Sequence, residues 1–250
     1  MNALHAAWKM ARGVVHAVCG LLIIAVLFPR ATHAERNVRV QVWARRMLAL
    51  VDIGLEVHGQ PPAAGPMLLV ANHISWLDIL MMLAAGHCRF VSKSEVRRWP
   101  LIGTLATGAG TLYIERGSRR DAMRVVHSMA ERLTAGDILA IFPEGTTSDG
   151  VAVLAFHGNL LQAAISARVP AQPVALAFVE TATGVPSQLP CYIGDDTLLA
   201  SIWRTLAGPP LTAVISYGQP QRGEGRDRRA WAADLRAEVL HLRGTRFSRE

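Results

Sequence analysis

The chain contains few cysteines: three thiols, at positions 19, 88 and 191, in 250 residues, with no Cys-x-x-Cys spacing. Isolated thiols argue against a disulfide framework and a cysteine-based zinc site, and they fit a reducing, cytoplasmic compartment. His87 and Cys88 are the only adjacent pair of soft metal ligands, and two neighbours on one backbone seldom complete a tetrahedral site. We therefore expect this protein to bind no metal.

Signatures of nucleic-acid binding are also missing. The sequence has no zinc-finger spacing, no aromatic RNA-binding motif and no basic helix interleaved with aromatic residues. It is nevertheless basic, with a formal charge of +7 and a pI near 10.1, and 51% of its residues are hydrophobic. That combination favours an anionic membrane surface, rather than nucleic acid, as the partner.

No linker or low-complexity segment divides the chain, whose length suits one large α/β domain or two small ones. One nearly continuous apolar run covers residues 13–28, close to the N-terminus. The run is marginal for a full span, because a spanning helix needs about 20 apolar residues. A short span, a monotopic anchor and a re-entrant helix therefore remain open.

A cleaved signal peptide is a further interpretation of this run, since a basic start and a short apolar stretch are its marks. Against it, no clean Ala-x-Ala site follows, and arginines crowd the flank at positions 30, 36, 39, 45 and 46. Such arginines suit anionic headgroups on the cytoplasmic side. We expect residues 1–48 to form a retained membrane anchor with a basic juxtamembrane helix, at the cytoplasmic face of the inner membrane, and residues 49–250 to form the α/β domain.

Apolar runs that end in polar turns recur along the rest of the chain and predict alternating strands and helices. Strands are expected over residues 66–71, 90–95, 110–116, 138–142, 169–178 and 211–217, the last of them at the edge of the sheet. Helices are expected over residues 77–85, 198–206 and 228–242. The pattern predicts an α/β fold with a mostly parallel or mixed central sheet flanked by helices.

Residues 72–78 place a histidine, His73, five positions before Asp78, where a strand gives way to a helix. An imidazole oriented by a carboxylate can take a proton from an alcohol. Five positions are too many for the two side chains to share one helix face, so they meet only if His73 lies in the turn. The spacing from Ser75 to Asp78 also matches a capping box, in which Asp78 serves only the first helical turn. Both interpretations stay open.

Cationic residues follow two further strands. Arg116 stands at the carboxyl end of one strand, where α/β sheets bind ligands, and its planar guanidinium suits a phosphate. It fits equally well as a surface arginine in a patch with Arg119 and Arg120. Lys93 ends another short run and can add positive charge to the same rim, although lysines are more often simply solvated.

A turn rich in small and hydroxylated residues follows the strand over residues 138–142. Its backbone N–H groups and the hydroxyls of Thr146, Thr147 and Ser148 are typical of a nest that holds an anion. Glu144 weakens that interpretation by adding negative charge, and instead suits a substrate hydroxyl or an arginine. The turn is alternatively an ordinary strand exit with Gly145 at a positive φ angle.

Taken together, these stretches resemble the glycerolipid acyltransferase family, which includes the bacterial 1-acylglycerol-3-phosphate acyltransferases. The family motifs N-H-x-x-x-x-D, G-x-x-[FY]-[IV]-x-R, F-P-E-G-T and V-P-x-x-P occur in that order at residues 72–78, 110–116, 142–146 and 169–173. We expect all four to border one cleft. The similarity extends over roughly residues 50–180.

The resemblance implies that His73 is the general base for the acceptor hydroxyl and that Asp78 fixes its tautomer and stabilises its charged form. It implies further that Arg116 and Lys93 hold an acceptor phosphate, while Glu144, Gly145 and Thr146 line the acceptor site. The alcohol then attacks a thioester directly, so no enzyme nucleophile, metal or cofactor is needed. The absence of a Gly-x-Ser-x-Gly elbow agrees with this.

The implied function is transfer of a fatty acyl group from acyl-CoA or acyl carrier protein to a lysolipid, with 1-acyl-sn-glycerol-3-phosphate as the favoured acceptor. Residues 156–159 lack the lysine that the family usually has there, and residues 147–150 resemble the branch that acylates lyso-ornithine lipids. A lyso-ornithine lipid or another lysophospholipid is therefore the alternative acceptor. The rivals from other classes are a noncatalytic lipid-binding membrane protein and a soluble thioester hydrolase.

Overall fold

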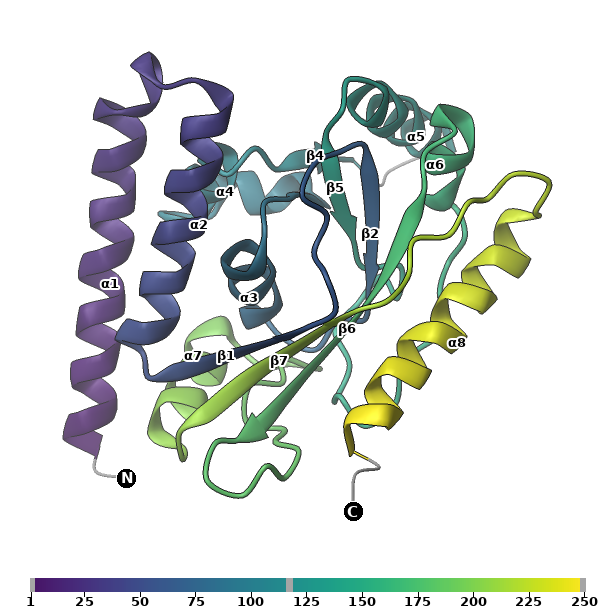
Figure 1. Cartoon of the computed structure of the whole chain (residues 1–250). Coiled ribbons are helices and arrows are strands. Elements are labelled where there is room, and N and C mark those ends of the chain that lie inside the picture. Colours follow the sequence, from purple (N-terminus) through teal and green to yellow (C-terminus); the bar gives the residue numbers. More distant parts are fainter. Residues whose placement is uncertain (1–2, 116–118, 248–250) are drawn as a thin grey trace.

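A computed structural model describes residues 3–115 and 119–247 of the chain. A seven-stranded sheet runs through these residues in the order β1-β7-β6-β2-β5-β3-β4 (Figure 1). The strands are β1 (Ile53–His58), β2 (Met67–Ala71), β3 (Arg89–Lys93), β4 (Leu112–Ile114), β5 (Ile138–Ile141), β6 (Ala171–Glu180) and β7 (Leu211–Tyr217). Neighbouring strands are parallel except β6 and β7, so the sheet is mixed, as predicted.

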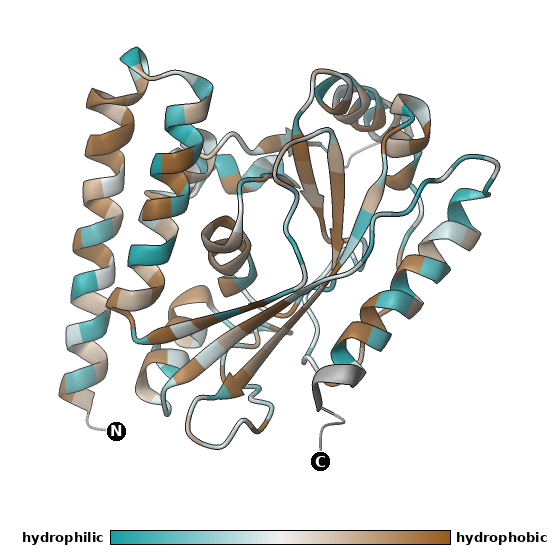
Figure 2. Ribbon diagram, viewed as in Figure 1, coloured by the Kyte–Doolittle hydropathy of each residue, from teal (hydrophilic) through white to brown (hydrophobic). Residues whose placement is uncertain are grey.

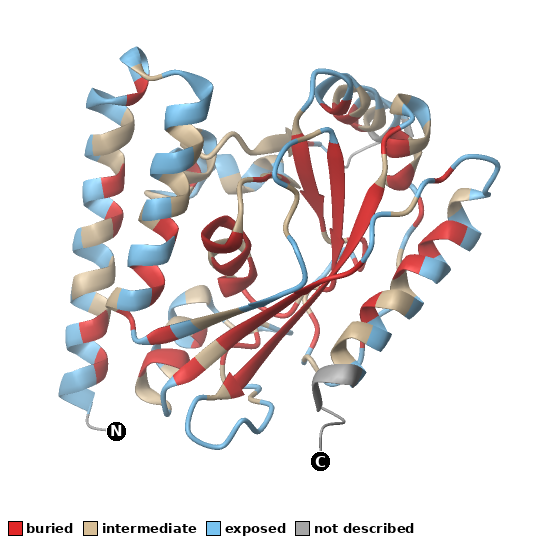
Figure 3. Cartoon of the chain, viewed as in Figure 1, coloured by how far each residue is buried: buried red, intermediate tan, exposed pale blue. Residues whose placement is uncertain are grey.

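Helices cover both faces of this sheet. On one face lie α2 (His33–Leu50), α3 (Leu77–Ala85) and α7 (Leu198–Ala207), and on the other lie α5 (Arg119–Thr134), α6 (Leu161–Ala167) and α8 (Arg228–Phe247). The central strands β2 and β5 are hydrophobic and buried along their whole length (Figures 2 and 3). Because successive strand residues point to opposite faces, Leu69 and Ala71 join one core while Leu68 and Val70 join the other.

The last strand contradicts one sequence expectation. We expected residues 211–217 at the edge of the sheet, but β7 lies between β1 and β6. Six of its seven residues are buried, as a strand with both faces covered requires. The edge belongs instead to β1, in which the exposed Gly54 and His58 and the half-buried Glu56 interrupt the apolar pattern.

The N-terminal helix α1 (Ala3–Val26) runs beside α2, to which it is joined through a short 3-10 helix, η1 (Phe28–Arg30) (Figure 1). It also contacts α7 and α4 (Ile102–Gly108). Gly20 permits the close approach, because a Cβ there would stand 2.7 Å from Trp43 Nε1 and 2.9 Å from Leu105 Cδ2. Within the described residues, the segment Ala3–Arg30 is the one helix long and apolar enough to cross a membrane.

Candidate active site

Asn72 fixes the place where the chain leaves the sheet. It follows the last residue of β2, and its buried side chain continues the pairing of β2 with β6. Asn72 Nδ2–H donates to the carbonyl of Leu176 at 3.0 Å, and the Leu176 N–H donates to Asn72 Oδ1 at 2.8 Å. This double hydrogen bond sets the position of the next residue, His73, at the carboxyl edge of the sheet.

His73 and Asp78 meet across the turn between β2 and α3. His73 Nδ1 lies 2.7 Å from Asp78 Oδ2, and the same oxygen accepts the N–H groups of Ile74 at 2.6 Å and Ser75 at 2.9 Å. Asp78 is fully buried, whereas the His73 side chain is 21% exposed. Because the carboxylate accepts from Nδ1–H, the Nε2 nitrogen carries the lone pair, and the ring can accept a proton there.

The capping interpretation of Asp78 is partly realised as well. The Ser75 N–H donates to the Asp78 carboxylate, which is one half of a capping box. The other half is missing, because Ser75 Oγ–H donates to the carbonyl of Pro190 at 2.6 Å and Oγ accepts the N–H of Leu77. The carboxylate therefore both supports the start of α3 and orients the imidazole.

The turn after β5 packs directly on this dyad. The imidazole of His73 stacks on the ring of Phe142, with ring centroids 4.0 Å apart and planes 7° from parallel. Glu144, which is only 4% exposed, accepts the His73 N–H at 3.0 Å and the Leu154 N–H at 3.3 Å. Burial raises the pKa of the Glu144 carboxyl, and the two backbone N–H groups act against that rise. Glu144 thus holds the backbone of His73 in place.

The hydroxyls of this turn serve backbone groups. Thr147 O–H donates to the carbonyl of Tyr192, while the N–H and O–H of Ser148 both donate to the carbonyl of His73, at 2.8 and 3.1 Å. Two of the three hydroxyls that suited an anion nest are therefore used internally. Gly145 has φ +76°, the positive angle expected for it, and both Gly145 and Thr146 are exposed.

The cationic residues predicted for an acceptor phosphate lie toward the edge strand β4. Lys93 is exposed at the end of β3 and is in register with Ile114, the last residue of β4. Arg116 lies outside the described residues, two positions beyond Ile114. The sheet order β2-β5-β3-β4 therefore brings the ends of these four parallel strands to one edge.

The fourth motif does not join that edge, contrary to our expectation that all four motifs border one cleft. Pro170 directly precedes β6, and Pro173 pairs in register with Val70, so this stretch lies along the body of β2 rather than at its carboxyl end. The reason is the length of β6, which has ten residues. It starts level with β2 but extends well beyond it, so its first residues lie beside β2.

Two arginines of α8 support the site and were not identified from the sequence. Arg236 Nε donates to the carbonyl of Leu154 at 2.8 Å, and Arg243 donates to the carbonyl of Gly150. These carbonyls belong to the segment that follows the Glu144 turn. The only available signal was their spacing of seven residues, which places both on one helix face.

No group of three or more His, Cys, Asp or Glu side chains within residues 3–115 and 119–247 is arranged to hold a metal ion. The expectation that the chemistry needs neither metal nor cofactor stays a prediction.

Comparisons with known proteins agree on one family. The sequence model of the family described as Acyltransferase matches residues 54–177. The chain is 42% identical to the lyso-ornithine lipid O-acyltransferase of Pseudomonas aeruginosa over 204 residues, which cover 81% of this chain and 78% of that protein. It is 38% identical to the 1-acyl-sn-glycerol-3-phosphate acyltransferase of Neisseria meningitidis over 185 residues, 73% of this chain and 71% of that protein.

The fold also matches a solved structure. The crystal structure of the 1-acyl-sn-glycerophosphate acyltransferase PlsC from Thermotoga maritima aligns with a TM-score of 0.68 over 97% of this chain and 96% of that one, at 20% identity. At that level of identity the likeness supports the architecture, including the N-terminal helices, and not a choice of substrate.

Proposed function

Because the chain belongs to the acyltransferase family and is an O-acyltransferase, we propose that it moves a fatty acyl group from acyl-CoA or acyl carrier protein to the free hydroxyl of a lysolipid. The observation that carries this proposal is the contact of 2.7 Å between His73 Nδ1 and Asp78 Oδ2. It leaves a proton-accepting Nε2 at the carboxyl edge of the sheet.

In the proposed reaction, His73 Nε2 takes the proton of the acceptor hydroxyl as its oxygen attacks the thioester carbonyl carbon. The new carbon–oxygen bond forms, the carbon–sulfur bond breaks, and the leaving thiolate takes the proton back from His73. Asp78 stabilises the imidazolium between these two steps, a division of labour known from hydrolytic triads. Neither a covalent enzyme intermediate nor a bound metal takes part.

We propose that Lys93 and Arg116 bind the anionic headgroup of the acceptor. Three strand spacings of about 4.8 Å, roughly 14 Å in all, separate β2 from β4. A headgroup bound between the imidazole and the cations has to bridge this distance. Gly145 and Thr146, which are exposed on the turn after β5, line the acceptor site. Glu144 contributes indirectly, because it holds the backbone of His73 in place.

The first candidate acceptor is 1-acyl-sn-glycerol-3-phosphate, whose phosphate suits two cations. A lyso-ornithine lipid is the second candidate. It is favoured by the 42% identity to the lyso-ornithine lipid O-acyltransferase and by residues 147–150. The phosphate of the first lipid and the ornithine carboxylate of the second can each bind these cations, so the same edge of the sheet serves either one.

An acceptor panel tests this proposal. Purified protein is supplied with acyl-CoA or acyl carrier protein thioester and several lysolipids, and the products are read by mass spectrometry. We expect a diacylated lipid, and we expect Arg116→Ala to raise the apparent KM for a phosphate-bearing lysolipid about tenfold or more, the size of one lost charged hydrogen bond. Arg132→Ala, at an exposed arginine of α5, is the matched control. Free fatty acid without acylated lipid indicates a hydrolase and refutes transfer.

We further propose that α1 lies in the membrane interface and does not cross the bilayer. Its outward side is mostly apolar, with exposed side chains that include Leu4, Trp8, Val14, Val15, Val18, Leu22 and Val26. Lys9 instead points inward, 2% exposed, with its Nζ 3.4 Å from Asp52 Oδ2. No Lys, Arg, Asp or Glu stands at an exposed position of α1, and Arg12 is half-buried, so the exposed face suits the membrane interface. Figures 2 and 3 show the mixture of hydrophobic and hydrophilic, buried and exposed positions along this helix.

If α1 crossed the bilayer, α2 would have to enter it as well, because the two helices lie side by side. Helix α2 exposes Arg39 and Arg46. An arginine at the bilayer centre costs about 2.5–3.5 kcal/mol, whereas at the headgroups it is attracted to anionic lipid. This supports a monotopic arrangement on the cytoplasmic face of the inner membrane, with residues 1–48 as the anchoring segment.

A charge placed on the apolar face of α1 is expected to weaken membrane binding. We expect Val15→Glu to lower the partition onto vesicles that contain phosphatidylglycerol by about tenfold or more, because a carboxylate must then enter the interface. Co-flotation of the protein with the vesicles measures this. The control is Met123→Glu, at a residue 69% exposed on α5, across the sheet. If Val15→Glu floats as well as Met123→Glu, α1 is not the anchor.

A further inference from the structure

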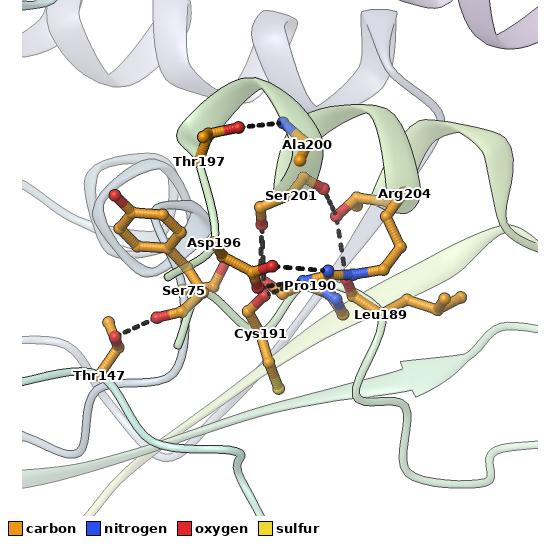
Figure 4. A network of polar contacts seen from close by, with 12 residues as sticks. Ser75, Thr147, Leu189, Pro190, Cys191, Asp196, Thr197, Ala200, Ser201 and Arg204 are labelled. Atoms are coloured by element: carbon orange, nitrogen blue, oxygen red, sulfur yellow. Dashed lines mark hydrogen bonds and ion pairs between the residues drawn. The ribbon is translucent and has the colours of Figure 1, made fainter. Parts of the chain in front are cut away.

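A loop that precedes α7 lies against the outer side of the His73–Asp78 turn. This loop, residues 189–196, contacts the first family motif through Ser75 and the turn just after the third motif through Thr147 (Figure 4). We refer to it as the backing loop. The carbonyls of Leu189, Pro190, Cys191 and Tyr192 all accept hydrogen bonds from neighbouring segments, so the loop needs its own support to stay in one conformation.

Arg204 of α7 provides that support. Its Nη1 and Nη2 groups donate to Asp196 Oδ1 and Oδ2 at 3.2 and 2.9 Å, its Nε donates to the carbonyl of Leu189 at 3.1 Å, and Nη2 also donates to the carbonyl of Cys191. One guanidinium therefore joins both ends of the backing loop to α7. The fork of fixed N–H groups makes these bonds together, which the single ammonium of a lysine does not.

Ser201, one turn earlier on α7, adds to this support. It is fully buried, and its hydroxyl lies 3.4 and 3.3 Å from the carbonyls of Pro190 and Cys191. Trp76, inside the catalytic turn, donates from its indole N–H to the same hydroxyl oxygen at 3.3 Å. Helix α7 therefore holds the backing loop and touches the turn itself.

The backing loop holds the two residues that bind the carboxylate of Asp78. Ser75 Oγ–H donates to the carbonyl of Pro190 at 2.6 Å, and the Tyr192 N–H donates to the carbonyl of Ile74 at 3.2 Å. Ile74 and Ser75 are the residues whose own N–H groups donate to Asp78 Oδ2. Contacts with the backing loop on the outer side of the turn thus fix the N–H groups of Ile74 and Ser75 on its inner side.

We propose that Arg204 is a positioning residue for the reaction, acting through the backing loop on the geometry of His73 and Asp78. This inference rests on the proposed function, in which that geometry performs the proton transfer. Without the guanidinium, the backing loop loses the bonds at both its ends, and Ile74 and Ser75 lose their outer partners. The carboxylate then shifts relative to the imidazole, although no atom that touches substrate has been changed.

The test compares Arg204→Ala and Arg204→Lys with Arg226→Ala, which removes another arginine–aspartate pair, with Asp234 at 3.2 Å, outside the site. We expect Arg204→Ala to lower kcat about 10–100-fold with KM for the acyl donor changed less than twofold, because small misplacements of catalytic groups are costly. Arg204→Lys should recover part of kcat by keeping the ion pair with Asp196. Arg226→Ala should leave kcat unchanged.

A spectroscopic measurement separates positioning from simple loss of structure. In protein with isotope-labelled histidine, the proton shared by His73 Nδ1 and Asp78 should give a far-downfield NMR signal, identified by its absence in Asp78→Asn. Arg204→Ala should shift or broaden this signal. The midpoint of thermal unfolding of the Arg204→Ala protein should stay near that of the Arg226→Ala protein. If kcat and the signal of folded Arg204→Ala equal those of the wild type, the positioning role is wrong. If the wild type transfers no acyl group, the proposed function fails, and the signal still decides the role of Arg204.

Discussion

Replacing His73 by alanine is expected to lower kcat by about 10²–10⁴-fold, the usual contribution of a positioned general base. The reason is geometric, because Asp78 occupies Nδ1 at 2.7 Å and thereby leaves Nε2 as the proton acceptor. Without the ring, the acceptor hydroxyl must attack the thioester with its proton still attached. Initial rates of diacyl lipid formation, measured at saturating donor and acceptor, provide the comparison.

The same substitution should cost little stability. The ring of His73 is 21% exposed, and its loss removes the stacking on Phe142 but leaves the N–H groups of Ile74 and Ser75 on Asp78. We expect a change of about 1 kcal/mol in the free energy of unfolding, typical of a single substitution. The control is His127→Ala, since that histidine is 76% exposed on α5 in a pair with Glu131. Substantial turnover by folded His73→Ala protein would disprove the base assignment.

Several parts of the fold could be predicted because they depend on local patterns. The helix predicted over residues 77–85 is α3 with the same bounds. An apolar stretch of this length indicates a helix, and the glycine that follows it indicates where the helix ends. The turn position of His73 followed from a spacing of five, which no continuous helix face permits. The helix predicted over residues 228–242 lies within α8, where Trp231, Leu235 and Val239 recur at intervals of four and are buried.

Other parts depend on contacts between residues far apart in sequence, and short patterns do not carry that information. The place of β7 between β1 and β6 depends on the weakly apolar β1, for which no strand was predicted. The bonds of Asn72 to Leu176 and of Ser75 to Pro190 join residues more than a hundred positions apart. Arg204 and Arg243 were indistinguishable in sequence from other surface arginines.

The structure gives the nonreacting residues of the motifs a common physical role. Glu144 binds the N–H of His73, Ser148, just after the third motif, binds its carbonyl, and Asn72 ties the preceding position to the backbone of Leu176; all three side chains are buried. Buried polar groups of this kind are stable only when paired, so each one admits few alternative arrangements of the turn. The dyad is therefore held mainly through its backbone, which leaves the imidazole itself accessible to substrate.

Asp78→Asn separates the two interpretations that the sequence left open. If Asp78 only supports the start of α3, the amide should lower the free energy of unfolding but leave kcat of the folded protein near the wild-type value. If Asp78 orients His73, the amide should lower kcat by up to about 10⁴-fold, because an NH2 group facing Nδ1 selects the tautomer with the proton on Nε2. The hydroxyl of the lysolipid then faces Nε2–H, which cannot take its proton. Asp137→Asn, which alters the ion pair with Arg89 at 3.2 Å, is the control.

The double variant His73→Ala/Asp78→Asn makes this test sharper. Residues that act as one unit lose their effect together, so kcat of the double variant should equal that of His73→Ala within about twofold. Independent roles would instead multiply the two losses. Because Oδ2 accepts Nδ1–H together with the N–H groups of Ile74 and Ser75, an amide NH2 in its place also loses those two bonds, so Asp78→Asn should lower the free energy of unfolding as well as kcat. A kcat of folded Asp78→Asn protein near the wild-type value would leave Asp78 with a structural role alone.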